Sequence, residues 1–172
     1  MRNTFDRFNG RHQDYQAARP SYAQEFLDWL GELYAPPERY TAADIGSGTG
    51  KLSAQLLAAG FRVCGVEPNP DMRGAAEALL GGDPRFSSSN GTDHDTGLPD
   101  RSVDMVAAAQ AFHWFDGPAF ARECRRILRP GGRAVLVWNV RGSAPMNQAL
   151  AQVFREHCPS FHGFTGGMGE DD

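Results

Sequence analysis

Three glycines at alternate positions, Gly46, Gly48 and Gly50, are the residues whose type and spacing most clearly suggest a binding site. An apolar run precedes them and a helical pattern of leucines follows, which predicts a strand, a tight turn and a helix. Glycine allows a ligand to approach the backbone closely and adopts positive φ angles readily. The helix N-terminus adds unpaired N–H groups and a partial positive charge. We therefore expect a ligand cradle at this turn, with a tight turn that binds nothing as the alternative.

Two acidic residues narrow the choice of ligand. Asp44 lies two positions before the first glycine, where a carboxylate would repel a pyrophosphate but suits a ligand with an ammonium group. Glu67 ends the next expected strand, at a spacing typical of the acid that accepts hydrogen bonds from ribose hydroxyls. A dinucleotide fingerprint would place its third glycine at position 51, which is Lys51. The pattern thus argues against a nucleotide-dependent oxidoreductase.

The arrangement Asp-x-Gly-x-Gly-x-Gly at 44–50 resembles the first motif of the class I S-adenosylmethionine-dependent methyltransferases. Further stretches, in the same order along the chain, resemble members of their type 11 subgroup: 15–22, 98–104, 111–115 and 128–132. The resemblance implies S-adenosyl-L-methionine as the cofactor and S-adenosyl-L-homocysteine as the product. It also implies a Rossmann-like fold.

The resemblance implies a set of cofactor-binding residues. Tyr15 would cover the reacting end of the cofactor and Arg19 would meet its carboxylate, both as part of an N-terminal lid. Alternatively, Tyr15 is a packing residue and Arg19 a surface charge. The complete expected set is Tyr15, Arg19, Asp44, Gly46, Ser47, Gly48, Gly50, Glu67, Pro68, Met72, Thr92, Asp93, Gln110 and His113.

Two positions that would meet the adenine carry open alternatives. Met72 is expected beside the adenine or in the core. Asp93 is expected to accept a hydrogen bond from the adenine amino group. Thr92, His94 and Asp95 compete with Asp93 for this role, because the alignment could shift by one or two positions.

His113 is the candidate catalytic residue. Its ordinary pKa near neutrality would let it act as a general base; the alternative is a histidine bonded to the backbone and packed beside Trp114. The reaction implied by the resemblance is in-line attack of an acceptor nucleophile on the methyl group. Such a reaction needs alignment and exclusion of water rather than a nucleophilic side chain.

Alternating strand and helix patterns predict an α/β fold with a doubly wound, mostly parallel sheet and flanking helices. Ser21 is expected to cap the first helix, Trp29 to lie on its buried face, and 128–132 to form a turn. Strands are expected at 40–45, 61–66, 85–89, 102–109 and 133–138, and helices at 21–34, 51–59, 71–81, 117–128 and 145–157.

The expected domain organisation has three parts. They are a lid segment and helix (1–40), a Rossmann-like cofactor-binding core (41–158), and a glycine-rich tail that we expect to be mobile (159–172). The last two strands of the usual seven have no residues assigned to them. The fifth strand would then have an uncovered edge, from which we expect a fragment or self-association into a homo-oligomer.

Composition limits the partners. The net charge of −4 provides no overall basic field for a nucleic acid, and no apolar stretch approaches the length of a membrane span. Three widely separated cysteines fit a reducing cytoplasm and argue against a zinc site, so no metal is expected. We therefore expect a cytoplasmic enzyme that methylates a small-molecule acceptor. The alternative is a cofactor-binding domain that is catalytically inactive.

Overall fold

The computed structural model describes residues 21–139 together with Gln152 and Glu156. The chain divides into two units, one ending at Val137 and the other beginning at Trp138. The expected lid residues, the glycine-rich tail and most of the helix expected at 145–157 lie outside the described residues. Of that helix, Gln152 and Glu156 are described; both are helical, and the Gln152 amide donates to the Glu156 carboxylate at 3.1 Å.

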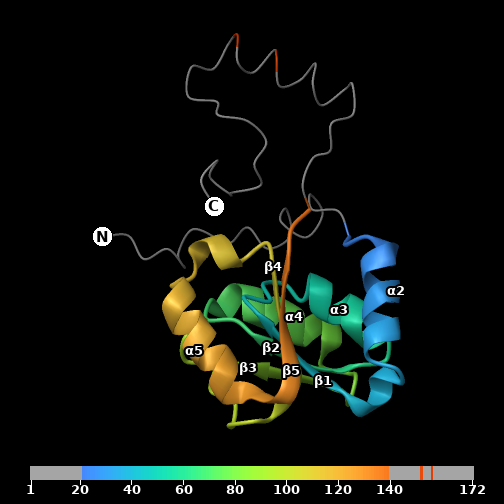
Figure 1. The fold of residues 1–172 in the computed structure, drawn as a ribbon. Coiled ribbons are helices and arrows are strands. Elements are labelled where there is room, and N and C mark those ends of the chain that lie inside the picture. Colours follow the sequence, from blue (N-terminus) through green and yellow to red (C-terminus); the bar gives the residue numbers. More distant parts are fainter. Residues whose placement is uncertain (1–20, 140–151, 153–155, 157–172) are drawn as a thin grey trace. The chain divides into compact units, whose positions relative to one another are not determined.

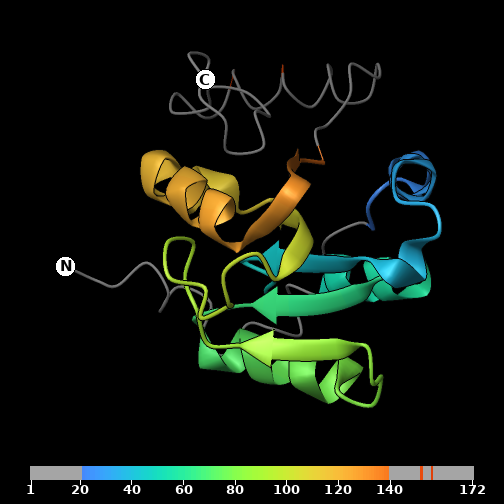
Figure 2. The same cartoon turned by 60° about the horizontal axis from the view of Figure 1, so that its bottom comes forward.

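A five-stranded sheet forms the centre of the first unit. Its strands are β1 (Thr41–Ile45), β2 (Arg62–Val66), β3 (Phe86–Ser89), β4 (Val103–Ala109) and β5 (Leu128–Val137). They are arranged in the order β3-β2-β1-β4-β5, and every neighbouring pair is parallel. Figure 2 shows β1, β2 and β3 as arrows that point the same way. The predicted doubly wound parallel sheet is confirmed.

Helices cover both faces of the sheet. They are α2 (Gln24–Leu33), α3 (Lys51–Ala58), α4 (Pro70–Leu80) and α5 (Gly117–Ile127), with short 3₁₀ turns η2 (Pro37–Arg39) and η3 (Phe112–Trp114). One core cluster joins α2 and α3 to the sheet, and a second joins α5 to the sheet. The two clusters use alternate residues of β1, so α5 packs on the face opposite α2 and α3 (Figure 1).

The order of the strands locates a topological switch point. The chain moves outward from β1 through β2 to β3, and then returns to place β4 on the other side of β1. In open parallel sheets, ligands bind outside the carboxyl ends of the two strands at such a point. These ends are followed here by the glycine turn after Ile45 and by the segment after Ala109, so both predicted binding segments lie at the switch point.

The first helix differs from its prediction. It begins at Gln24, and Ala23 occupies the N-cap position without a side-chain hydrogen bond, so the prediction that Ser21 caps it is wrong. Trp29 is 48% exposed, whereas Leu27 and Leu30 are buried. The expected buried face for Trp29 is therefore also wrong. The helix uses a neighbouring apolar stripe, because Tyr22 is tied to Gln55 of α3 by two hydrogen bonds of 3.1 Å that set its approach.

The predicted turn at 128–132 is instead part of β5. Leu128 pairs with Val103 and Arg133 pairs with Met105, so several residues of β5 lie opposite a single residue of β4. Gly131 has a φ of +85°, and a Cβ on Gly132 would lie 2.9 Å from the carbonyl oxygen of Asp104. The glycines therefore absorb a bulge within the strand rather than reversing the chain.

Candidate cofactor-binding site

The backbone of the glycine turn is left-handed at all three glycines. The φ angles are +70° at Gly46, +57° at Gly48 and +82° at Gly50. The N–H groups of Gly46 and Ser47 donate to the carbonyl of Val66 in β2, at 2.9 and 3.2 Å. Because only glycine adopts such angles without strain, the predicted backbone requirement is confirmed.

The three glycines have different surroundings. A Cβ on Gly46 would lie 2.8 Å from the Cβ of Ala111, and one on Gly50 would lie 2.8 Å from Leu80. A Cβ on Gly48 would meet nothing within 4 Å. Gly46 and Gly50 are therefore needed for packing inside the protein, whereas Gly48 faces open space.

Glu67 is bound to the same turn. Its carboxylate is 8% exposed and accepts hydrogen bonds from the N–H groups of Gly48 and Asn69, both at 2.9 Å. Burial raises the pKa of Glu67, and these two N–H groups partly offset that effect. A carboxylate has about four lone-pair sites, so both oxygens keep capacity for hydroxyl donors. The acid thus sits beside the open position at Gly48, as a ribose-binding group would.

Asp44 lies behind the turn. It is 1% exposed, and its carboxylate accepts a hydrogen bond of 2.7 Å from the hydroxyl of Ser53 in α3. Burial raises the pKa of Asp44 to about 6, although the hydroxyl of Ser53 lowers it. The side chain therefore braces β1 against α3. Its contact with a ligand ammonium group stays a prediction.

Two residues that the sequence reasoning missed hold the segment after β2. Asn69 caps α4, since its side-chain oxygen accepts from the N–H groups of Asp71 and Met72 at 3.0 Å. Arg73 donates to the carbonyls of Glu67 and Pro68 at 2.8 and 3.3 Å. An asparagine directly before a proline that begins a helix is an N-cap signal, so Asn69 could have been predicted. No local sequence pattern predicts the contacts of Arg73.

The segment that follows β4 packs against the glycine turn. Gln110 has a φ of +55°, which is strained for a residue other than glycine, and its N–H donates to the carbonyl of Val137 at 2.8 Å. A Cβ on Gly46 would meet Ala111, as described above, and would also lie 3.3 Å from the ring of Phe115, so both residues pack close to this glycine. His113 lies in η3 with its ring 4.9 Å from that of Trp114. The structure thus brings the glycine turn and the segment containing Gln110 and His113 together, and general-base catalysis by His113 stays a prediction.

The loop after β3 carries the predicted adenine-binding residue. Asp93 accepts a hydrogen bond of 3.1 Å from the N–H of Asp116, which caps α5, and its carboxylate lies 3.0 Å from His94. The hydroxyl of Thr92 accepts from the N–H of Asp95 at 3.1 Å. Thr92 and Asp95 thus shape the loop, and His94 is exposed beside Asp93. The adenine roles of Thr92 and Asp93 stay predictions.

The remaining expected residues are placed as follows. Met72 is 3% exposed and is one of the buried residues of α4, and its place beside the adenine stays a prediction. Tyr22 is buried against the core as well. Tyr15 and Arg19 lie outside the described residues, so the lid they were expected to form is untested.

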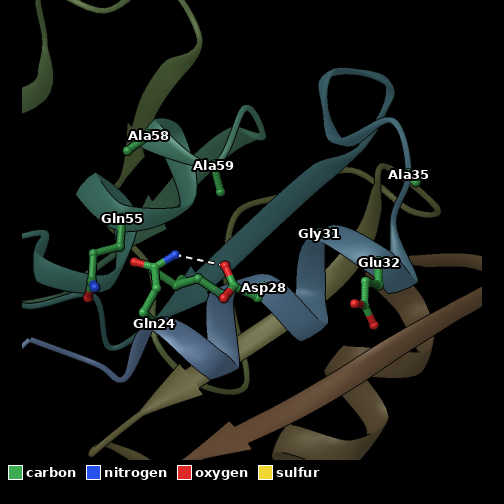
Figure 3. A pocket seen from close by; sticks show the side chains of 9 residues that line it. Gln24, Asp28, Gly31, Glu32, Ala35, Gln55, Ala58 and Ala59 are labelled. Carbon is green, nitrogen blue, oxygen red and sulfur yellow. Dashed lines mark hydrogen bonds between the residues drawn. The ribbon is translucent and has the colours of Figure 1, made fainter.

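An open groove of about 830 Å³ runs between α2 and α3. Figure 3 shows Gln24, Asp28 and Glu32 of α2 on one side, and Gln55 with Ala58 of α3 on the other. None of the residues that line this groove belongs to the expected cofactor-binding set. The groove is therefore separate from the residues of the glycine turn.

Taken together, the strand order and the flanking helices define a Rossmann-like domain. Residues 43–136 match the family model described as a methyltransferase domain. The chain is 42% identical over 127 residues to an uncharacterized methyltransferase of Mycobacterium tuberculosis, covering 74% of this chain and 49% of that protein. It is 31% identical over 147 residues to an uncharacterized methyltransferase of Schizosaccharomyces pombe, covering 84% and 57%.

Solved structures of methyltransferases also match this chain. A structure from Anaeromyxobacter dehalogenans assigned as a type II methyltransferase matches with a TM-score of 0.63 and 36% identity, covering 81% of this chain and 56% of that one. A methyltransferase from Aquifex aeolicus that depends on S-adenosylmethionine shares the fold, with a TM-score of 0.58 and 19% identity, covering 76% and 77%. This chain belongs to the type 11 subgroup of the class I S-adenosylmethionine-dependent methyltransferase family. It spans about half the length of the curated relatives it matches.

In the part of the chain that the structure describes, no helix combines the length and apolar character needed to cross a bilayer.

Proposed function

We propose that this chain binds S-adenosyl-L-methionine at the switch point and takes part in methyl transfer to a small-molecule acceptor. The observation that carries the proposal is the pairing of Gly48 with Glu67. The glycine leaves open space beside a left-handed backbone, and the adjacent carboxylate has capacity for ribose hydroxyls. The family to which the chain belongs supports the same cofactor.

The chemistry requires little of the protein beyond placement. The bound cofactor supplies a methyl group on a sulfonium, which is a good leaving group for in-line displacement. In the proposal, the glycine turn and Glu67 fix the nucleoside, and the segment containing Gln110 and His113 separates it from the acceptor. We propose that Tyr15 and Arg19 close over the methionine end. With reactants so aligned and water excluded, no nucleophilic side chain is needed.

The experiment that tests the proposal is a calorimetric titration of the 172-residue chain with S-adenosyl-L-homocysteine, with NADH as the control. We expect micromolar binding of the first ligand and none of the second. An acceptor screen with labelled S-adenosyl-L-methionine then tests transfer. Binding without transfer to any acceptor would favour the alternative, a catalytically inactive cofactor-binding domain. Absence of binding by either ligand would contradict both.

Replacing Glu67 with alanine should weaken binding of S-adenosyl-L-homocysteine by about 1–3 kcal/mol, because charge-assisted hydrogen bonds to the ribose are lost. The N–H of Gly48 also loses its acceptor. Calorimetry of the variant measures the change, and Glu25→Ala, on the exposed side of α2, serves as the control. An unchanged affinity in Glu67→Ala would remove Glu67 from the ribose role.

We further propose that the protein is cytoplasmic and that two copies associate through β5. Among the described residues, no strand pairs with the outer edge of β5, and Leu136 in this strand is 40% exposed. An unpaired edge is a template for pairing with another chain. Light scattering across a concentration series should show a dimer, and Leu136→Lys should shift the protein toward the monomer. A concentration-independent monomer would contradict this proposal.

A further inference from the structure

A buried acid on α5, Glu123, holds the loop that carries Asp93. Its side chain is 7% exposed. One of its oxygens accepts hydrogen bonds from both the N–H and the hydroxyl of Thr96, at 2.9 and 2.5 Å. Thr96 is fully buried, and its own carbonyl accepts from the hydroxyl of Ser89 at the end of β3, at 2.7 Å. Every polar group of Thr96 is therefore bonded, and the residue cannot shift without losing several of these bonds.

Arg126 completes this cluster on the solvent side. It donates to both oxygens of Glu123 at 2.7 and 2.8 Å, and to Asp100 at 2.7 Å. The guanidinium, followed by the bonds from Thr96, lowers the pKa of Glu123 to about 2, so the acid is ionised at neutral pH. Glu123 and Thr96 are buried, so removing either one leaves a buried polar group of the other without its partner, whereas Arg126 and Asp100 remain in contact with solvent.

The two ends of the loop, Gly91 and Thr96, are in contact with each other. A Cβ on Gly91 would lie 2.5 Å from the carbonyl oxygen of Thr96, so the two backbone segments are in direct contact. Between them, the N–H of Thr92 donates to the carbonyl of Asp95 at 2.8 Å. Asp93 lies within this closed turn and is bonded to the N-cap of α5 through Asp116. The loop is thus held by α5 at two points, Asp116 and Glu123.

We propose that Glu123 is a positioning residue for the loop of Asp93, and that its bonds to Thr96 make cofactor binding selective for adenine over a deaminated base. This inference rests on the proposed function, in which Asp93 accepts a hydrogen bond from the adenine amino group. Glu123 contacts no ligand atom in this arrangement. It fixes the place of the Asp93 carboxylate, and a hydrogen bond is lost when its acceptor moves by about an ångström.

The test compares S-adenosylhomocysteine with S-inosylhomocysteine, in which an oxygen replaces the adenine amino group. Calorimetry gives the ratio of the two affinities for the unmodified chain, Glu123→Gln and Thr96→Val. The control is Arg122→Gln, because Arg122 lies on the exposed side of α5. Hydrogen exchange of amides 91–96 in the ligand-free protein reports on the loop independently of binding. Thr96→Val keeps the size of the side chain and decides the question if Glu123→Gln does not fold.

We expect the unmodified chain and the control to prefer the adenine ligand at least about tenfold, the effect of one charge-assisted hydrogen bond. In both loop variants the preference should fall below about threefold, exchange of amides 91–96 should rise, and affinity for the inosine ligand should change little. A preserved ratio, even with weaker binding of both ligands, would overturn the proposal and make Glu123 a structural brace only. No preference in the unmodified chain would also overturn it, while leaving cofactor binding intact. Failure to bind either ligand would instead refute the proposed function.

Discussion

Replacing Gly50 with alanine should lower the free energy of unfolding by about 2–5 kcal/mol, whereas the same change at Gly48 should mainly reduce cofactor affinity. Both residues have left-handed backbones, so a Cβ costs each about 1–2 kcal/mol. At Gly50 the new methyl would also lie 2.8 Å from Leu80 and 3.1 Å from Ala76 of α4, and overpacking adds about 1–3 kcal/mol. At Gly48 the methyl would enter the open space that the nucleoside is proposed to fill.

Urea unfolding and titration with S-adenosyl-L-homocysteine measure the two effects separately. Gly74→Ala is the matched control, because this position is helical and a Cβ there meets nothing within 4 Å. It should leave binding unchanged and stabilise the fold by up to about 1 kcal/mol. We expect Gly48→Ala to weaken binding at least about tenfold, which corresponds to 1.4 kcal/mol. Equal losses of stability and affinity in the Gly48 and Gly50 variants would show that the two glycines share one role.

The sequence was sufficient to predict the glycine turn and the doubly wound parallel sheet, because both depend on local signals. Alternating apolar runs and glycine breaks define each strand and helix without reference to distant residues. The carboxyl ends of β1 and β4 then meet by topology alone, which brought the turn at Gly48 and the segment at Gln110 together as expected.

The different surroundings of the three glycines could not be predicted from local patterns. Gly46 and Gly50 are required by contacts with Ala111 and Leu80, which lie 65 and 30 positions further along the chain. The contact of Glu123 with Thr96 likewise joins two elements that no sequence pattern relates. Local patterns identify which residues have special backbones, whereas packing between distant segments decides what each one faces.

The same reason explains the errors at the edges of the fold. In α2, several apolar stripes were available, and the bonds between Tyr22 and Gln55 selected the one that leaves Trp29 half exposed. In β5, the glycines at 131–132 are compatible with a turn as well as with a bulge in a strand. They form a bulge because Asp104 binds both Arg129, at 2.6 Å, and the N–H of Thr41, at 2.8 Å. At both places, polar contacts between distant segments outweighed the structure that the local sequence pattern favours.

Replacing Asp44 with asparagine should make the protein more stable than the unmodified chain at pH 8, but not at pH 4. Burial raises the pKa of Asp44 in the folded state from 3.8 to about 6, so the folded state binds this proton more tightly than the unfolded chain. Stability is then lost as the pH rises from about 4 to 6, by about 3 kcal/mol at 1.36 kcal/mol for each pH unit. Asparagine, which resembles the protonated acid, does not incur this loss and can still accept from Ser53.

Urea unfolding of both proteins between pH 4 and 8 tests this expectation. Glu67 also has a raised pKa, and its charge is one cause of the raised pKa of Asp44, so the two acids titrate as a coupled pair and the difference between the proteins includes this coupling. Glu123 has a pKa lowered to about 2, so the stability that it contributes is lost only as the pH falls below about 4.5. A constant difference across the range would contradict the raised pKa of Asp44. Repeating the series with saturating S-adenosyl-L-homocysteine separates the structural role of Asp44 from its proposed contact with the ligand. An ammonium group in contact with Asp44 would lower the pKa of this acid, so binding would strengthen as the pH rises from 5 to 7. The asparagine variant would not show this dependence on pH.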